Sequence, residues 1–174
     1  MGFLHDFEFV SCATNIIHVN NAKLNFLKTE FLDLLAPLES DAIGNWGKMK
    51  GQHMVEHFAD SVKIASGKLL LPRVNEGERL EKSRSFLLSE TPFRENLKNP
   101  FIGENVLELR QPSMTAALEK LKNELHYFFS VFETDPTLTT HNPFFGELDY
   151  AGNVQFLHKH AMHHLKQFGL VGER

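Results

Sequence analysis

The sequence has a single cysteine, Cys12, among 174 residues. One thiol cannot form a disulfide within the chain, which excludes the disulfide framework of a small secreted protein. Apolar runs long enough to span a bilayer are also missing. The first nine residues carry two acidic side chains where a signal peptide would be basic, and Asp6 occupies the Ser/Thr position of a myristoylation motif. We therefore expect a cytoplasmic protein that is neither exported nor bound to a membrane.

Positive charge is scarce as well. The 18 Lys and Arg residues are outnumbered by 22 Asp and Glu residues, which gives a formal net charge of -4. Without a basic excess or a long Lys/Arg stripe, a nucleic-acid partner is excluded from the expected functions. One Trp and two Tyr stand against 16 Phe, so we expect a Phe-rich interior. The length fits one domain, which we place at 1–174.

Four segments have the three- and four-residue apolar spacing of amphipathic helices. They cover 20–38, 54–65, 113–132 and 150–168. Ser113 is a good N-cap, while Gly67 and Gly169 can end the helices before them. Since no segment has a comparably strong strand pattern, the sequence predicts an all-α fold, specifically a four-helix bundle.

The segment 67–112 is a long crossover between the second and third predicted helices. It contains a possible short helix at 78–88 and an extended piece at 105–110, but no dominant period. A connection of this length is usually a functional cover or has structure of its own. We expect small elements that cap one end of the bundle, and we interpret 1–19 as an N-terminal extension.

Histidine is concentrated in the fourth predicted helix, which carries His158, His160, His163 and His164 within seven residues. Histidine is the commonest metal-binding side chain, although such a cluster can also be a solvated helix face. On a helical wheel, the apolar stripe of this helix consists of Val154, Leu157, Ala161, Leu165 and Phe168. His164 and His160 lie along one edge of the stripe, and His163 points away from it. The wheel therefore selects His160 and His164 as a metal-binding pair and predicts a surface position for His163.

The second predicted helix offers a third ligand, because its wheel places His57 on one flank of the core. Three neutral imidazoles with open coordination positions suit a catalytic metal, whereas structural zinc usually has four protein ligands. Neighbouring polar residues could orient a ligand ring or form an ordinary polar flank; they are His53, Glu56 and Asp60. His141 could line a pocket or cap a backbone group, ahead of a turn marked by Pro143 and Gly146. Trp46 is interpreted as a packing anchor.

Two blocks of sequence carry a family resemblance. The first is Trp46-Gly47-Lys48-Met49 followed by Gln52-His53-Met54-Val55-Glu56-His57. The second is His141-Asn142-Pro143-Phe144-Phe145-Gly146, which leads to His160-Ala161-Met162-His163-His164-Leu165-Lys166-Gln167-Phe168-Gly169. In order and spacing, these blocks resemble the DinB-like (YfiT-like) superfamily of metal-binding four-helix bundles, and within it a bacterial family of uncharacterised function.

The resemblance implies a divalent metal ion held by His57, His160 and His164, with zinc or nickel favoured and iron or another ion as alternatives. Some members of the superfamily are thiol transferases that use bacillithiol, mycothiol or glutathione, and others are similar to hydrolases or isomerases. It thus implies a metal-dependent enzyme for a small-molecule substrate, often as a homodimer. A non-catalytic metal-binding or stress-response bundle and a purely structural helical protein are the alternatives. The general base, and whether His53, His141 or His163 joins the site, stay open.

Overall fold

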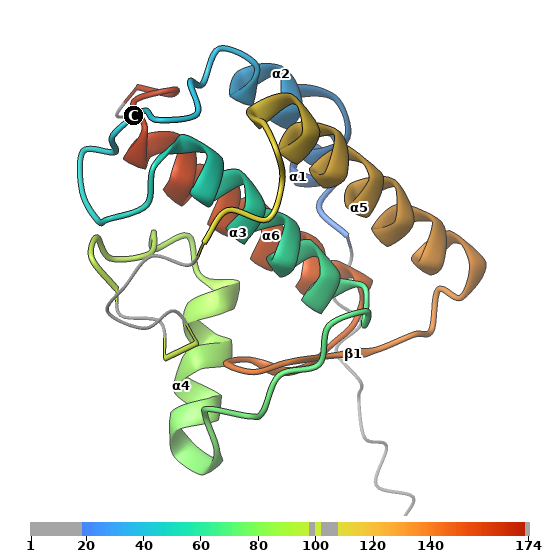
Figure 1. Cartoon of the computed structure of the whole chain (residues 1–174). Helices are drawn as coiled ribbons and strands as arrows, with labels where there is room; N and C mark the ends of the chain where they lie inside the picture. The colour runs from blue at the N-terminus through green and yellow to red at the C-terminus, as the bar shows by residue number, and fades with distance from the viewer. Residues whose placement is uncertain (1–18, 98–99, 102–107, 173–174) are drawn as a thin grey trace, which may run out of the picture.

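The computed structural model describes residues 19–97, 100–101 and 108–172. The chain is mainly helical, as expected, and also contains a small two-stranded sheet (Figure 1). The elements in chain order are α1 Asn21–Asn25, η1 Phe26–Glu30, α2 Phe31–Leu35, α3 Gly51–Ala65, α4 Gly77–Leu88, α5 Met114–Thr134, β1 Thr140–Asn142, β2 Gly146–Leu148 and α6 Tyr150–Gln167. Among these described helices, none is both long and apolar enough to cross a membrane.

The strands β1 and β2 are a correction to the purely α-helical expectation. They form an antiparallel hairpin in which Thr140 is opposite Leu148. The Asn142 side chain accepts hydrogen bonds from the backbone N–H groups of Phe144 and Phe145, and Gly146 adopts a φ of 72°. Such side-chain bonds and a left-handed glycine are typical of a tight turn. The turn itself was predicted, but three-residue strands are too short to produce a detectable alternation.

The first predicted helix forms with a π-helical middle turn, η1, between α1 and α2. The Asn20 side chain caps it by accepting from the N–H groups of Ala22 and Lys23. The helix ends at Leu35 rather than at Leu38, because the following Pro37 cannot continue the hydrogen-bond ladder.

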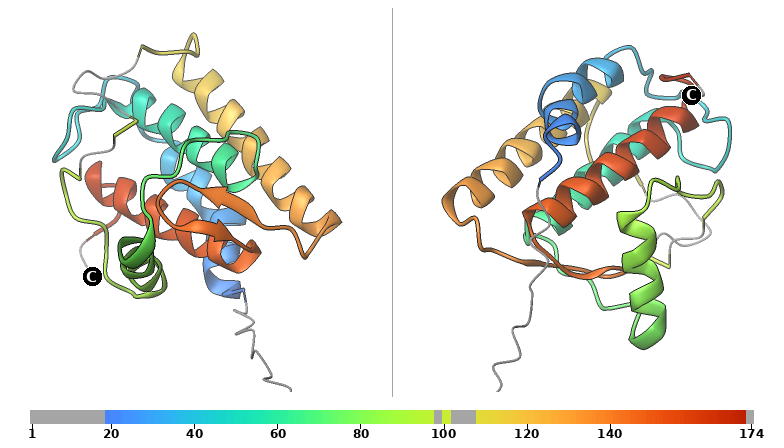
Figure 2. Two further views of the ribbon diagram at one scale, coloured as in Figure 1. Left: turned by 90° about the horizontal axis from the view of Figure 1, so that it is seen from below. Right: turned by 180° about the vertical axis from the view of Figure 1, so that it is seen from behind.

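The core lies where the first helical segment, α3, α5 and α6 pack together (Figure 2). It is rich in Phe as predicted, and Phe31, Phe58 and Phe128 are fully buried. The Ser113 side chain caps α5, and Gly67 follows α3 with a φ of 76°. Both helix-end signals are therefore confirmed, and the apolar stripes position α3 beside α6.

Within the long connection, the predicted short helix is confirmed as α4, which packs against α6 (Figure 1). Lys159 of α6 is buried, and its ammonium group donates to the carbonyl of Phe86 in the last turn of α4 and to those of Ser89 and Thr91 just after it. The Phe86 carbonyl is one of the acceptors that a helix terminus leaves open. Residues 105–107 of the expected extended piece lie outside the described residues, and 108–110 have no regular structure.

Candidate metal centre

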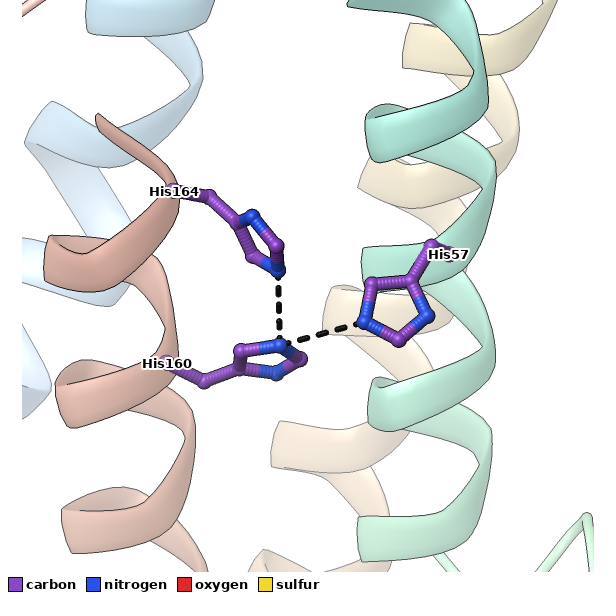
Figure 3. A group of neighbouring side chains, drawn as sticks. All are labelled: His57, His160 and His164. Atoms are coloured by element: carbon purple, nitrogen blue, oxygen red, sulfur yellow. Dashed lines mark hydrogen bonds between the residues drawn. The ribbon is translucent and has the colours of Figure 1, made fainter. Parts of the chain in front are cut away.

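Three histidines from two helices converge on one point. His57 lies in the middle of α3, whereas His160 and His164 lie one turn apart on α6 (Figure 3). The Nε2 atom of His160 is 3.2 Å from Nε2 of His57 and 2.8 Å from Nε2 of His164. One nitrogen from each ring lies within 4.8 Å of the others, which is close enough for the three histidines to hold one metal ion.

The antiparallel packing of α3 and α6 produces this convergence. Thr140 bonds both the Ala65 carbonyl at the end of α3 and the Asn153 side chain in the first turn of α6. At the other end, Asn45 ahead of α3 donates to the carbonyl of Gln167, the last residue of α6. Side chains four residues apart on α6 therefore face the same turn of α3.

The spacing of the nitrogens fits a divalent ion. With metal–nitrogen bonds of about 2.0 to 2.1 Å, two ligand nitrogens are about 2.9 Å apart at a right angle and about 3.4 Å apart at the tetrahedral angle. Two of the separations, 2.8 and 3.2 Å, lie close to this range, and the ligand nitrogens all lie within 4.8 Å of one another. Three protein nitrogens leave further coordination positions for water or a substrate.

Burial among aromatic rings keeps the imidazoles neutral. The His160 ring contacts the rings of Phe58 and Phe156, whose centroids are 5.3 and 5.6 Å from its own. Burial lowers the pKa of His57 to about 4. Burial also lowers the pKa of His160 and of His164 well below the usual value, and the neighbouring imidazoles add to this effect. The rings are therefore uncharged at neutral pH, which is the form that binds metal.

The second nitrogen of His160 leaves the tautomer of this ring open. Its Nδ1 atom is buried and has no hydrogen-bond partner among the described residues. A neutral imidazole carries one proton, on Nδ1 or on Nε2. With that proton on Nδ1, the Nε2 atom presents a lone pair toward the other two rings. A bound cation would stabilise this arrangement.

Gln167 belongs to the site, although it had no predicted role. It is 2% exposed, and its Oε1 atom lies 2.7 Å from Nδ1 of His164. Its Nε2 atom donates to the backbone carbonyl of Trp46 at 2.8 Å. The sequence held a signal for this contact, because a residue three positions after a ligand lies on the same face of the helix and metal-binding histidines bond through their second nitrogen.

The surface position predicted for His163 is wrong. The ring is half-buried, with centroids 5.7 Å from Trp46 and 5.9 Å from Phe93. Its burial lowers the pKa of His163, which a hydrogen bond with the Phe93 backbone opposes. The helical wheel gave the correct direction relative to the core but could not show that two loops cover this outer face. Trp46 does pack here, whereas His158 packs against Phe26.

The polar neighbours on α3 make their contacts elsewhere. The Glu56 carboxylate accepts N–H groups from the side chain of Gln52, the backbone and side chain of Arg110 and the backbone of Gln111. These donors lower the pKa of Glu56, although its burial acts in the opposite direction. Asp60 forms ion pairs with Arg110 at 2.8 Å and with Lys63. These carboxylates connect α3 to the end of the long connection.

The remaining two candidates also stay outside the histidine group. His53 has a buried Nδ1 atom without a partner in the described part of the chain. His141 pairs with Glu147 across the hairpin at 2.9 Å between Nδ1 and Oε1, instead of capping a backbone group. A cross-strand partner is decided by strand register, which was not predicted.

Comparison with known proteins identifies no relative: no family model, curated protein or solved structure matches the chain. The resemblance to the DinB-like superfamily stays a prediction.

Proposed function

We propose that this protein is a metal-dependent enzyme of the DinB-like superfamily, a four-helix bundle that activates a thiol or a water molecule on a three-histidine divalent metal site. The observation that carries the proposal is the convergence of His57, His160 and His164 as neutral imidazoles. The reaction is thiol transfer or hydrolysis of a small substrate. Zinc or nickel is the favoured ion and iron a further option, because imidazole suits all three.

A divalent ion held by these rings lowers the pKa of a thiol or water bound to it, which supplies a nucleophile near neutral pH. The chain contributes neutral ligands and the apolar wall formed by Phe58 and Phe156. The general base is assigned to none of the three candidates. Glu56 and Asp60 are engaged by cationic and backbone N–H groups, and His141 is engaged by a carboxylate.

The alternative is a non-catalytic metal-binding or stress-response bundle that acts through protein contacts. It predicts stoichiometric metal without an open, substrate-sized cavity beside the triad, whereas an enzyme needs room there for its substrate. Two of the hollows on the described part of the chain, of about 50 and 150 Å³, are lined by other residues.

The deciding experiment is elemental analysis of untagged protein. We expect about one divalent ion per wild-type chain, as a single three-histidine site implies. Replacement of His57, His160 or His164 by Ala is expected to abolish it. His126→Ala is the matched control, because His126 is an exposed histidine on α5. Equal retention of metal in all three site variants would refute both the enzyme and the metal-binding module.

Activity then separates the two proposals. Metal-loaded and chelator-treated protein are compared on thiols with electrophiles and on simple esters and amides. Turnover that requires both metal and the three histidines supports the enzyme. Stoichiometric metal without turnover on any substrate of this panel supports the non-catalytic bundle.

A further inference from the structure

Gln167 links the histidine group to the loop ahead of α3. On one side of its amide, Oε1 lies 2.7 Å from Nδ1 of His164. On the other side, Nε2 lies 2.8 Å from the carbonyl oxygen of Trp46. The side chain is 2% exposed, so water does not compete for these two contacts. The amide is therefore a buried bridge between a proposed metal ligand and a backbone carbonyl.

This bridge fixes which nitrogen of His164 carries the proton. A backbone carbonyl only accepts hydrogen bonds, so the NH₂ group of Gln167 must face Trp46. The amide oxygen must then face Nδ1 of His164, and an oxygen acceptor requires a proton on that nitrogen. Neutral imidazole carries only one proton, so Nε2 of His164 is left with a lone pair. That nitrogen faces the other two histidines (Figure 3).

The surrounding backbone holds the amide in place. A Cβ atom on Gly44 would lie 2.9 Å from Cγ of Gln167, and one on Gly47 would lie 2.9 Å from its Nε2. Gly47 also has a φ of 79°, which side-chain-bearing residues rarely adopt. Asn45 donates its N–H to the Gln167 carbonyl at 2.7 Å. The loop therefore wraps Gln167 so closely that the amide has little room to turn over.

We propose that Gln167 is a positioning residue of the metal centre: through the Trp46 carbonyl, its amide holds His164 as the tautomer whose bare Nε2 faces the cation. The inference rests on the metal site proposed above and adds a residue that fixes the tautomer of one of its histidines. A ligand ring whose tautomer and orientation are set before binding needs no rearrangement when the ion arrives. Loss of such a partner typically weakens metal affinity by about 10- to 100-fold.

The test compares Gln167→Met with Gln155→Met, both titrated with Zn²⁺ against a competing chelator. Gln155 is the matched control, because it lies on the same helix and also forms an amide bridge, from Lys23 to the Leu87 carbonyl. We expect Gln167→Met to bind one Zn²⁺ with about 10- to 100-fold lower affinity. Gln155→Met is expected to bind as tightly as wild type, even if it is less stable.

Gln167→Glu tests separately the two contacts of the amide, to His164 and to the Trp46 carbonyl. A carboxylate still accepts from Nδ1 of His164 but cannot donate to the Trp46 carbonyl. We expect its Zn²⁺ affinity to be restored toward wild type, because a carboxylate is a common partner of a metal-binding histidine. Its melting temperature should be lower, because the Trp46 carbonyl loses its donor. Affinity as weak as that of Gln167→Met would overturn the proposal.

A measurement without metal provides the remaining check. Nitrogen-15 NMR of the imidazoles reports which nitrogen carries the proton. We expect wild-type His164 to be protonated on Nδ1 and Gln167→Met to show a mixture of tautomers. A proton on Nε2 in the wild type, or unchanged Zn²⁺ affinity in Gln167→Met, refutes the positioning role. If wild type binds no Zn²⁺ at all, it is the proposed function that fails.

Discussion

Glu56 and His57 are neighbours on α3, yet the fold satisfies their polar atoms in opposite ways. Four N–H groups surround the Glu56 carboxylate, from Gln52, Arg110 and Gln111. His57 instead approaches another imidazole, with 3.2 Å between the two Nε2 atoms. A saturated buried group holds two segments together, whereas buried nitrogens that face one another are better satisfied by a ligand. Two adjacent residues of α3 therefore differ in role: Glu56 makes a structural contact, and His57 belongs to a candidate binding site.

The largest expected effect is the stabilisation by metal. At Zn²⁺ concentrations about 1,000 times its Kd, the free energy of unfolding should rise by about 4 kcal/mol. His160→Ala should remove this increment, because the Nε2 atom of His160 contacts both other histidines of the proposed site. Urea unfolding with Zn²⁺ and with chelator measures it. Glu56→Gln is the control and should keep the increment; if it loses the increment as well, the two sides of α3 are not functionally distinct.

The second effect is on the metal-free protein. Glu56→Gln should lower the free energy of unfolding by about 2 kcal/mol, because an amide NH₂ then meets buried N–H donors and an ion pair is lost. His57→Gln should lower it less, because the His57 ring has one close polar contact with another segment, His160, whereas the Glu56 carboxylate accepts three N–H groups from the segment before α5. Urea unfolding in the presence of chelator compares the two. A lower free energy of unfolding for His57→Gln than for Glu56→Gln would contradict this contrast.

The third effect is on acid stability without metal. The pKa of His57 is about 4 in the folded chain against 6.5 for the free side chain, so only the unfolded chain takes up this proton between those values. Stability therefore falls as pH drops through that window, by roughly 1 kcal/mol per pH unit. The pKa of Glu56 is lowered from 4.5, so its contribution is lost only at lower pH.

The test is urea unfolding of wild type and His57→Gln in the presence of chelator, from pH 7 to pH 4. It shows whether the His57 contribution to stability is lost at higher pH than that of Glu56. The variant should show the shallower pH dependence, and Glu56→Gln should match the wild-type slope above pH 5. Identical slopes for wild type and His57→Gln would mean that the ring is not held neutral by burial.

The smallest effect is expected at the hairpin. His141→Gln removes the pair with Glu147, whose side chain is 53% exposed. An exposed pair of this kind contributes little, so the free energy of unfolding should change by less than about 0.5 kcal/mol. Zn²⁺ stoichiometry should stay the same. A loss of bound metal in this variant would bring His141 back into the site.

Sequence periodicity predicted much of this fold because the helices are long and amphipathic. Ser113 and Gly67 marked helix ends correctly, and the α6 wheel placed His160 and His164 on the edge that meets α3. The hairpin strands were missed because three residues give no measurable alternation. The environment of His163 was missed because a wheel describes one helix and not the loops that cover it.

The sequence by itself determined which residues line each helix face, and therefore which three histidines could meet. The tertiary structure decided how their remaining polar atoms are satisfied. Gln167 reaches the carbonyl of Trp46, 121 positions away in the chain, and Glu56 receives the backbone N–H groups of the segment that precedes α5. Helical periodicity is local and repeats every 3.6 residues, whereas these contacts depend on the course of whole loops through space.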